Sequence, residues 1–140
     1  MLVRLGVINK VDTEIYYLSR CYATRHGAGP LAYDFETLKG IRVDDKTNIP
    51  NEFQGYLRLA PLNLHAMYDA IDWDKRGHPN EARYYTVVTC CDQIIPDTEC
   101  LDYVKYIDRD GILNTVSNTE FIRRLDWEFD YKVYSPEGPL

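Results

Sequence analysis

The sequence lacks several features that would place it in a common class of protein. It has no apolar run approaching the ~20 residues of a membrane-spanning helix, and its first residues do not resemble a signal peptide. It contains neither the glycine-rich phosphate loop that ends in Lys-Ser or Lys-Thr nor a legible Ser/His/Asp arrangement. We therefore expect a cytoplasmic protein that binds no membrane and does not use phosphate-loop chemistry.

The sequence also has fewer basic than acidic side chains. The chain carries 22 acidic and 16 basic side chains, which gives a net charge of −6. A general nucleic-acid binder needs a basic face that displaces phosphate counterions, so we expect no nucleic-acid partner. A small nucleotide in a local basic pocket remains compatible with this balance. Because residues 97–137 are the more acidic region, such a pocket should use Arg25 or Arg58.

The four cysteines and three histidines do not form a metal-binding signature. Cys90 and Cys91 are adjacent, whereas Cys21 and Cys100 stand apart in the sequence. We interpret the cysteines as reduced, mostly buried, small apolar residues. The sequence therefore predicts neither a metal site nor a cofactor.

The chain does have the composition of one compact domain, which we place at residues 1–140. It is 45% hydrophobic and 27% charged, as in ordinary globular proteins. Its twelve tyrosines are many for this length. They could pack in the core and at its rim, or they could present their hydroxyl groups to a ligand.

Hydrophobic periodicity predicts interleaved strands and helices. Apolar patterns indicate strands at residues 2–8, 14–22, 56–60, 84–91, 103–107, 112–116 and 131–134. Helical spacing indicates a helix over residues 61–75, and Ser117 and Glu120 have the capping-box spacing before a second helix. The pattern predicts a single α/β domain with a mixed, largely parallel sheet and a few helices.

Three loops follow predicted strands and could carry a site. They are residues 24–30, 91–93 and 135–139. Open α/β sheets bind ligands outside the carboxyl ends of their strands. If the strands before these loops are parallel neighbours, the loops converge on one crevice.

Four side chains in or near these loops allow two interpretations each. Arg25 and Arg58 offer a planar fork of donors for phosphate or carboxylate, or they are ordinary surface residues. Asp92 could accept two N–H groups from a base such as guanine, or it could cap the turn after its strand. His26 could act as an acid or base, or it could bond to the backbone beside a glycine turn.

Residues 22–30, Tyr-Ala-Thr-Arg-His-Gly-Ala-Gly-Pro, closely resemble the segment Y-x-T-R-x-G-A-G-P of adenylosuccinate synthetases. In that family the segment lies against the nucleotide substrate, IMP. Few positions of the segment are free, so a chance match of this length is uncommon. The resemblance implies a ligand-binding role for Thr24, Arg25, His26, Gly27, Ala28 and Gly29.

Three further segments agree with the same family, in the same order along the chain. Residues 51–58 look like the loop ahead of the arginines that handle aspartate and the nucleotide. Residues 87–93 are similar to the strand ending in T-K-L-D, which recognises guanine, and residues 134–139 resemble the closing S-x-G-P turn beside that base. The resemblance implies a fold like the C-terminal part of a synthetase. It implicates Asn51, Gln54, Arg58, Asp92 and Ser135 in ligand binding.

The departures from the family limit what the resemblance implies. The family's phosphate loop, and the aspartate and histidine that catalyse phosphoryl transfer, have no counterpart in these residues. Cys90 stands in place of the guanine-contacting lysine, and Arg58 is followed by Leu59 rather than by further arginines. We therefore expect no catalytic residues and no ligase activity from this chain alone.

The residues leave three hypotheses open. The first is a small protein that binds or sequesters a purine nucleotide, such as a phage protein that soaks up nucleotide signals. The second is the C-terminal subunit of a split adenylosuccinate synthetase, completed by a separate GTP-binding half. The third is an interaction module without a ligand. Since a domain cut from a larger fold exposes a former internal face, we also expect a homo-oligomer or a complex with the missing half.

Overall fold

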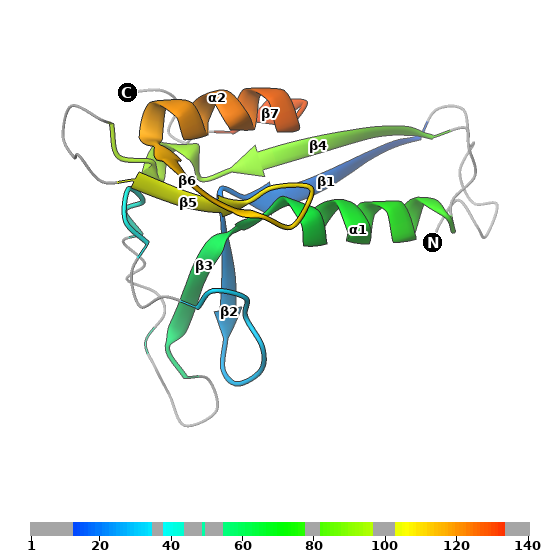
Figure 1. Cartoon of the computed structure of the whole chain (residues 1–140). Helices are drawn as coiled ribbons and strands as arrows, with labels where there is room; N and C mark the ends of the chain where they lie inside the picture. Colours follow the sequence, from blue (N-terminus) through cyan, green and yellow to red (C-terminus); the bar gives the residue numbers. More distant parts are fainter. Residues whose placement is uncertain are drawn as a thin grey trace.

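The described residues contain two β-sheets, and the first consists of parallel strands. A computed structural model describes residues 13–34, 38–43, 49, 55–77, 82–96 and 103–133 (Figure 1). Within them, the strands β1 (Glu14–Arg20), β4 (Arg83–Thr89) and β7 (Tyr131–Lys132) pair in the order β1-β4-β7. The apolar run predicted over residues 84–91 thus becomes the central strand of this sheet.

The second sheet is mixed. Its strands are β2 (Tyr22–His26), β3 (Leu57–Asn63), β5 (Tyr103–Ile107) and β6 (Leu113–Ser117), in the order β2-β3-β5-β6. β3 and β5 run parallel, whereas β2 is antiparallel to β3 and β5 is antiparallel to β6. Together with two helices, the described strands form a single α/β domain, which confirms the predicted class.

Cys21 marks the passage from one sheet to the other. We predicted one strand over residues 14–22, but β1 ends before Cys21 and β2 begins after it. The amide of Cys21 donates a hydrogen bond to the carbonyl of Thr89 at 3.0 Å, and its side chain is fully buried. The chain therefore bends where it is anchored to the end of β4, and apolar alternation alone does not reveal such a bend.

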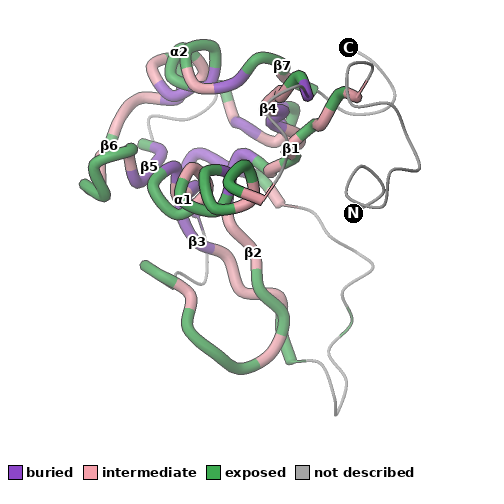
Figure 2. The backbone as a smooth tube through the Cα atoms, turned by 90° about the vertical axis from the view of Figure 1, so that its right-hand side faces the viewer, coloured by how far each residue is buried: buried purple, intermediate pink, exposed green. Residues whose placement is uncertain are grey.

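β2 and β3 form an arm that extends away from both helices (Figure 1). Because the two strands are antiparallel, with His26 opposite Leu57, the end of β2 and the start of β3 lie together at the free end of the arm. Residues 27–34, which we call the arm loop, follow β2 there, and Figure 2 shows this end of the molecule as largely exposed.

The helix α1 (Leu64–Lys75) begins three residues later than predicted. Residues 61–63 continue β3, because they still pair with β2 on one side and with β5 on the other. The side chain of Asn63 then accepts a hydrogen bond from the amide of Ala66 at 2.9 Å and caps the helix.

The helix α2 (Asn118–Glu128) begins where the capping-box spacing predicted it. The hydroxyl of Ser117 accepts a hydrogen bond from the amide of Glu120 at 3.2 Å. The predicted hairpin before it is confirmed as well, since the turn at Asp110 and Gly111 joins β5 to β6. Neither of the described helices is long and apolar enough to cross a membrane.

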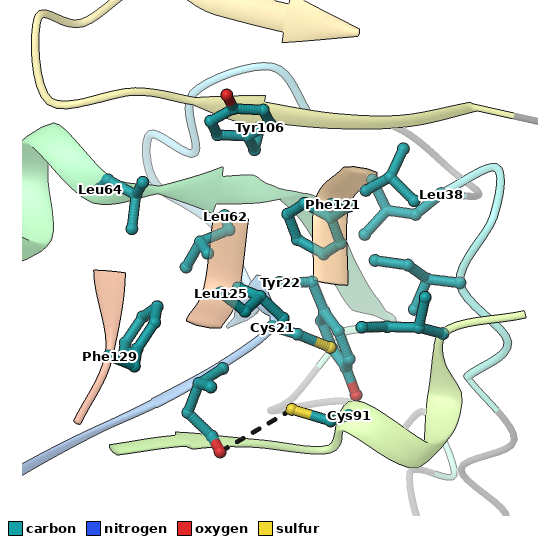
Figure 3. Close-up of a cluster of buried hydrophobic side chains, with 14 residues drawn as sticks. Cys21, Tyr22, Leu38, Leu62, Leu64, Cys91, Tyr106, Phe121, Leu125 and Phe129 are labelled. Carbon is teal, nitrogen blue, oxygen red and sulfur yellow. Dashed lines mark hydrogen bonds between the residues drawn. The ribbon is translucent and has the colours of Figure 1, made fainter. Parts of the chain in front are cut away.

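One hydrophobic core joins the two sheets and α2 (Figure 3). Phe121 and Leu125 of α2 are buried in it, and the ring of Phe121 lies 5.8 Å from that of Tyr106 on β5. Cys21 and Cys91 are buried in the same cluster, as expected of small apolar residues. Burial raises the pKa of the Cys91 thiol to about 11, so this thiol stays protonated at neutral pH.

Some predictions fall on residues that the structure does not describe. They are the strand over residues 2–8, most of the loop over residues 44–55, and Cys100. The last predicted strand is described over Tyr131–Lys132 as β7, and Tyr134 lies beyond the described part.

Candidate functional site

The arm brings the two candidate arginines together. In the antiparallel register of β2 and β3, Arg25 lies directly opposite Arg58. Like charges at such a position repel each other, since opposed side chains on one face lie only about 5 Å apart. The pairing is tolerated because both guanidinium groups turn to hydrogen-bond acceptors in the arm loop.

Arg58 binds the loop most completely. One of its terminal nitrogens, Nη1, donates hydrogen bonds to the carbonyls of Gly27 and Gly29 at 3.0 and 2.8 Å. Its Nε donates to Oδ2 of Asp34 at 2.7 Å, and Nη2 lies 2.6 Å from the same carboxylate oxygen. The charge of Arg58 is therefore neutralised within the loop, and its geometry makes it the organiser of the loop.

Arg25 binds the same loop without a carboxylate partner. Its Nε donates to the carbonyl of Ala28 at 3.1 Å, and Nη1 donates to the carbonyl of Pro30 at 3.3 Å. Among the described residues no acid forms an ion pair with Arg25, and the side chain is exposed. A positioned but uncompensated guanidinium on the surface is suited to an anion.

The two glycines of the loop are there for different reasons. Gly27 and Gly29 have φ values of +69° and +116°, which L side chains rarely adopt. A methyl group at Gly29 would also lie 2.3 Å from Nη2 of Arg25, whereas at Gly27 it would meet nothing within 4 Å. Gly29 thus makes room for the Arg25 guanidinium, and Gly27 supplies the turn.

The other residues of the predicted loop take lesser parts. Thr24 lies half-buried on β2 opposite Leu59, and Ala28 contributes its carbonyl to Arg25. His26 is exposed at the end of β2. Within the described part of the chain, no carboxylate is paired with His26 to orient it as an acid or base.

Asp92 does not join this site. It is exposed in the short 3₁₀ helix η2 (Cys91–Gln93), which is tied to the first residue of β2 because Tyr22 donates its hydroxyl hydrogen to Gln93 at 2.7 Å. The arm loop follows the last residue of β2, so roughly 15 Å of strand separates the two. The predicted strand over residues 14–22 does supply a parallel neighbour of β4, namely β1. Residues 24–30 and 91–93 nevertheless do not converge on one crevice, because β2 carries the loop into the other sheet.

Three candidate residues cannot be placed. Asn51, Gln54 and Ser135 lie outside the described residues, so the structure neither adds them to the arm loop nor removes them from it. The sequence did not point to Asp34, which neutralises Arg58 although the two residues are 24 positions apart in the sequence. Its only signal was an acidic residue shortly after a loop with an arginine, which is too common a pattern to single out.

Comparison of the chain with known protein families, with curated proteins and with solved structures finds no match. The resemblance to adenylosuccinate synthetases therefore depends on the residues of the sequence itself.

The arm loop presents hydrogen-bond donors and glycine backbone at the surface. The guanidinium of Arg25 forms no ion pair with a described residue, whereas that of Arg58 is paired with Asp34. Gly27 and Gly29 leave the backbone of the loop without side chains at two positions. In the part of the chain that the structure describes, no group of three or more histidine, cysteine or acidic side chains could hold a metal ion. The loop contains no cysteine or lysine that could act as a nucleophile.

Proposed function

We propose that the arm loop binds the phosphate of a purine nucleotide, and that the protein binds or sequesters this nucleotide without ligase activity of its own. The proposal depends on how the guanidinium of Arg25 is held and on its charge. Two carbonyls of the loop fix its guanidinium at 3.1 and 3.3 Å, and no carboxylate among the described residues neutralises it. The remaining N–H groups of this fork are the donors that a phosphate would accept.

The surroundings of Arg25 favour a phosphate over a larger anionic surface. The protein as a whole has a net charge of −6, so an extended polyanion is repelled, while a single phosphate experiences mainly the nearest cation. The glycine backbone of the loop lets a ligand approach closely. The purine is the part of the proposal that comes from the resemblance to adenylosuccinate synthetases, whose nucleotide lies against the same segment. A cytoplasmic location, where such nucleotides are abundant, belongs to the same proposal.

Titration calorimetry with a panel of purine nucleotides tests this function. The panel should include IMP, AMP, GTP, a cyclic nucleotide and ADP-ribose, with inosine as the control that lacks phosphate. We expect saturable heat with at least one nucleotide and none with inosine. Equal binding of inosine and IMP would show that Arg25 does not recognise a phosphate.

A second candidate function has its own observation in the first sheet. Tyr16, Leu18 and Tyr131 are exposed on one side of this sheet, and the rings of Tyr16 and Tyr131 lie 6.2 Å apart. We call this side the open face. A large exposed apolar surface favours a partner, which could be a second copy of the chain or a separate GTP-binding half of a split synthetase. Light scattering of the purified protein separates a homo-oligomer from a monomer that lacks its partner.

A further inference from the structure

A pocket of about 390 Å³ lies outside the arm loop. It is lined by residues of β1, α1, the beginning of β4, the turn between β5 and β6, and the end of α2, and none of its lining residues belongs to the arm loop. Its volume is within the range of pockets that hold small molecules, roughly 300–1,000 Å³. We call it the tyrosine pocket, because Tyr17, Tyr68 and Tyr84 form its walls.

The rings of the tyrosine pocket already hold two of the protein's own cations. The guanidinium carbon of Arg109 lies 3.8 Å from the ring centroid of Tyr68, and Nζ of Lys75 lies 5.1 Å from that of Tyr84. The negative face of an aromatic ring attracts a cation at such distances. The walls therefore have the electronic character that selects positive charge.

Negative charge gathers at the same place. The carboxylates of Asp126, Glu128 and Asp130 line the pocket, at the end of α2. The C-terminal end of a helix carries partial negative charge, so acids there are unfavourable for the stability of the helix. Since α2 has no basic residue in its last turn, its own sequence does not relieve this repulsion.

Two of these three carboxylates form ion pairs with described residues, and Asp130 forms none with them. Arg109 pairs with Glu128 at 2.7 Å, and Lys132 pairs with Asp126. Asp130 instead accepts hydrogen bonds from the amide and the hydroxyl of Thr86, at 2.7 and 2.9 Å. These bonds, led by that from the backbone amide, lower the pKa of Asp130, and the charge of Lys75 lowers it further, so Asp130 is ionised at neutral pH.

Trp127 completes the pocket from the outside. It lines the pocket between two of the acids, and its side chain is 87% exposed. An indole ring is the best aromatic partner of a cation, and its exposure to water is costly unless something covers it. Among the described residues, no cation or aromatic ring is stacked on Trp127.

We propose that the tyrosine pocket binds a small organic cation, an alkylammonium or alkylguanidinium, whose charge faces Asp130 and whose methylene groups lie against Trp127. The aromatic walls and the carboxylate of Asp130 favour this class of ligand, whereas the charge of Lys75 opposes it. The site is independent of the arm loop, so it can exist whether or not the protein binds a nucleotide.

Fluorescence of a single tryptophan tests the proposal with agmatine as the probe, since agmatine carries a guanidinium and an ammonium group. The chain has two tryptophans, so Trp73→Phe leaves Trp127 as the only one. We expect a saturable change of its emission as agmatine is added. The matched control is Trp127→Phe, because Trp73 is also exposed but does not line the pocket, and its emission should not change.

Two charge variants in the Trp73→Phe background fix the sign of the ligand. Asp130→Asn should weaken agmatine binding about tenfold or more, because it removes the unpaired carboxylate. Lys75→Gln should strengthen binding, because Lys75 repels the ligand and occupies the ring of Tyr84. AMP serves as the anionic probe and should leave the emission of Trp127 unchanged even if it binds the arm loop, because no residue of that loop lines the pocket. The proposal is overturned by an unchanged emission up to ~10 mM agmatine, by weaker agmatine binding in Lys75→Gln, or by a saturable response to AMP alone.

Discussion

Arg25 and Arg58 carry the same guanidinium group, but among the described residues only Arg58 is paired with a carboxylate. Arg58 is bound to Asp34 and to two loop carbonyls, so removing it would leave the carboxylate and the carbonyls without their donor. Among the described residues, Arg25 is bound only to carbonyls. Arg58 therefore orders the loop, and we propose that Arg25 binds the ligand. The resemblance to adenylosuccinate synthetases implied a ligand for both arginines and could not separate their roles, because it did not reveal Asp34.

Replacing each glycine of the arm loop with alanine should have unequal effects. Gly27→Ala places a methyl group in open space, so its cost is that of a left-handed alanine, roughly 1–2 kcal/mol. Gly29→Ala adds a clash with the Arg25 guanidinium, 2.3 Å away, so it should also displace that group. We expect Gly29→Ala to weaken nucleotide binding much more than Gly27→Ala, as measured by calorimetry. Equal losses in the two variants would contradict the assigned role of Arg25.

Asp130 should make the stability of the protein depend on pH. Its folded pKa is lowered by the bonds from Thr86, so the stability it contributes is present above the ordinary pKa of about 4 and is lost as the pH falls through the lower folded pKa. Asp130→Asn should therefore be less stable than the wild type at pH 7. The difference between the two should shrink below about pH 4. Urea unfolding at several pH values checks this, and a constant difference down to pH 2 would contradict it.

At the scale of elements, local signals predicted the helix starts and hairpins that depend on neighbouring residues. The cap at Ser117 and the turn at Asp110 and Gly111 involve groups within a few positions of each other, so the sequence reveals them. The bounds of α1 and the break at Cys21 depend on pairing with distant strands instead. Residues 61–63 have a helical spacing, yet β2 and β5 hold them in the sheet.

The two helix caps, at Ser117 and Asn63, test whether local hydrogen bonds stabilise the helix starts. Ser117→Ala and Asn63→Ala should each lower the free energy of unfolding by about 1 kcal/mol, because each leaves an amide at a helix start without its acceptor. Arg123→Ala is the control on α2, since its ion pair with Glu120 is long, at 3.7 Å, and exposed. Chemical denaturation of the three variants compares them. A cap variant as stable as the control would show that the helix start is held by packing alone.

At the scale of the whole molecule, the strand order decides which candidate residues meet. β1 pairs with β4, which follows it about half a chain length later in the sequence, whereas β2 belongs to the other sheet. These pairings join residues far apart in sequence, so no local pattern could show that Asp92 and the arm loop lie at opposite ends of β2. The sequence did predict an α/β domain and identify the loop, but not the separation of its candidate residues.

The single core predicts that both sheets unfold together. Leu125 packs in a cluster with residues of both sheets, such as Val88 and Leu62. Leu125→Ala should lower the free energy of unfolding by roughly 2–5 kcal/mol, and circular dichroism and tryptophan fluorescence should report one common transition. Leu18→Ala on the open face is the matched control and should change stability little. Separate transitions for the two signals would mean that the sheets are independent units.

The proposed binding of a purine nucleotide's phosphate by Arg25 is tested by calorimetry of Arg25→Ala with the nucleotide that binds the wild type most tightly. A hydrogen bond to a charged group contributes about 1.5–3 kcal/mol, so we expect the affinity to fall roughly 10- to 100-fold. Arg123→Ala, which removes the same charge from α2, should bind like the wild type. Wild-type affinity in the folded Arg25→Ala variant, or no binding of any purine nucleotide to the wild type, would contradict the claim.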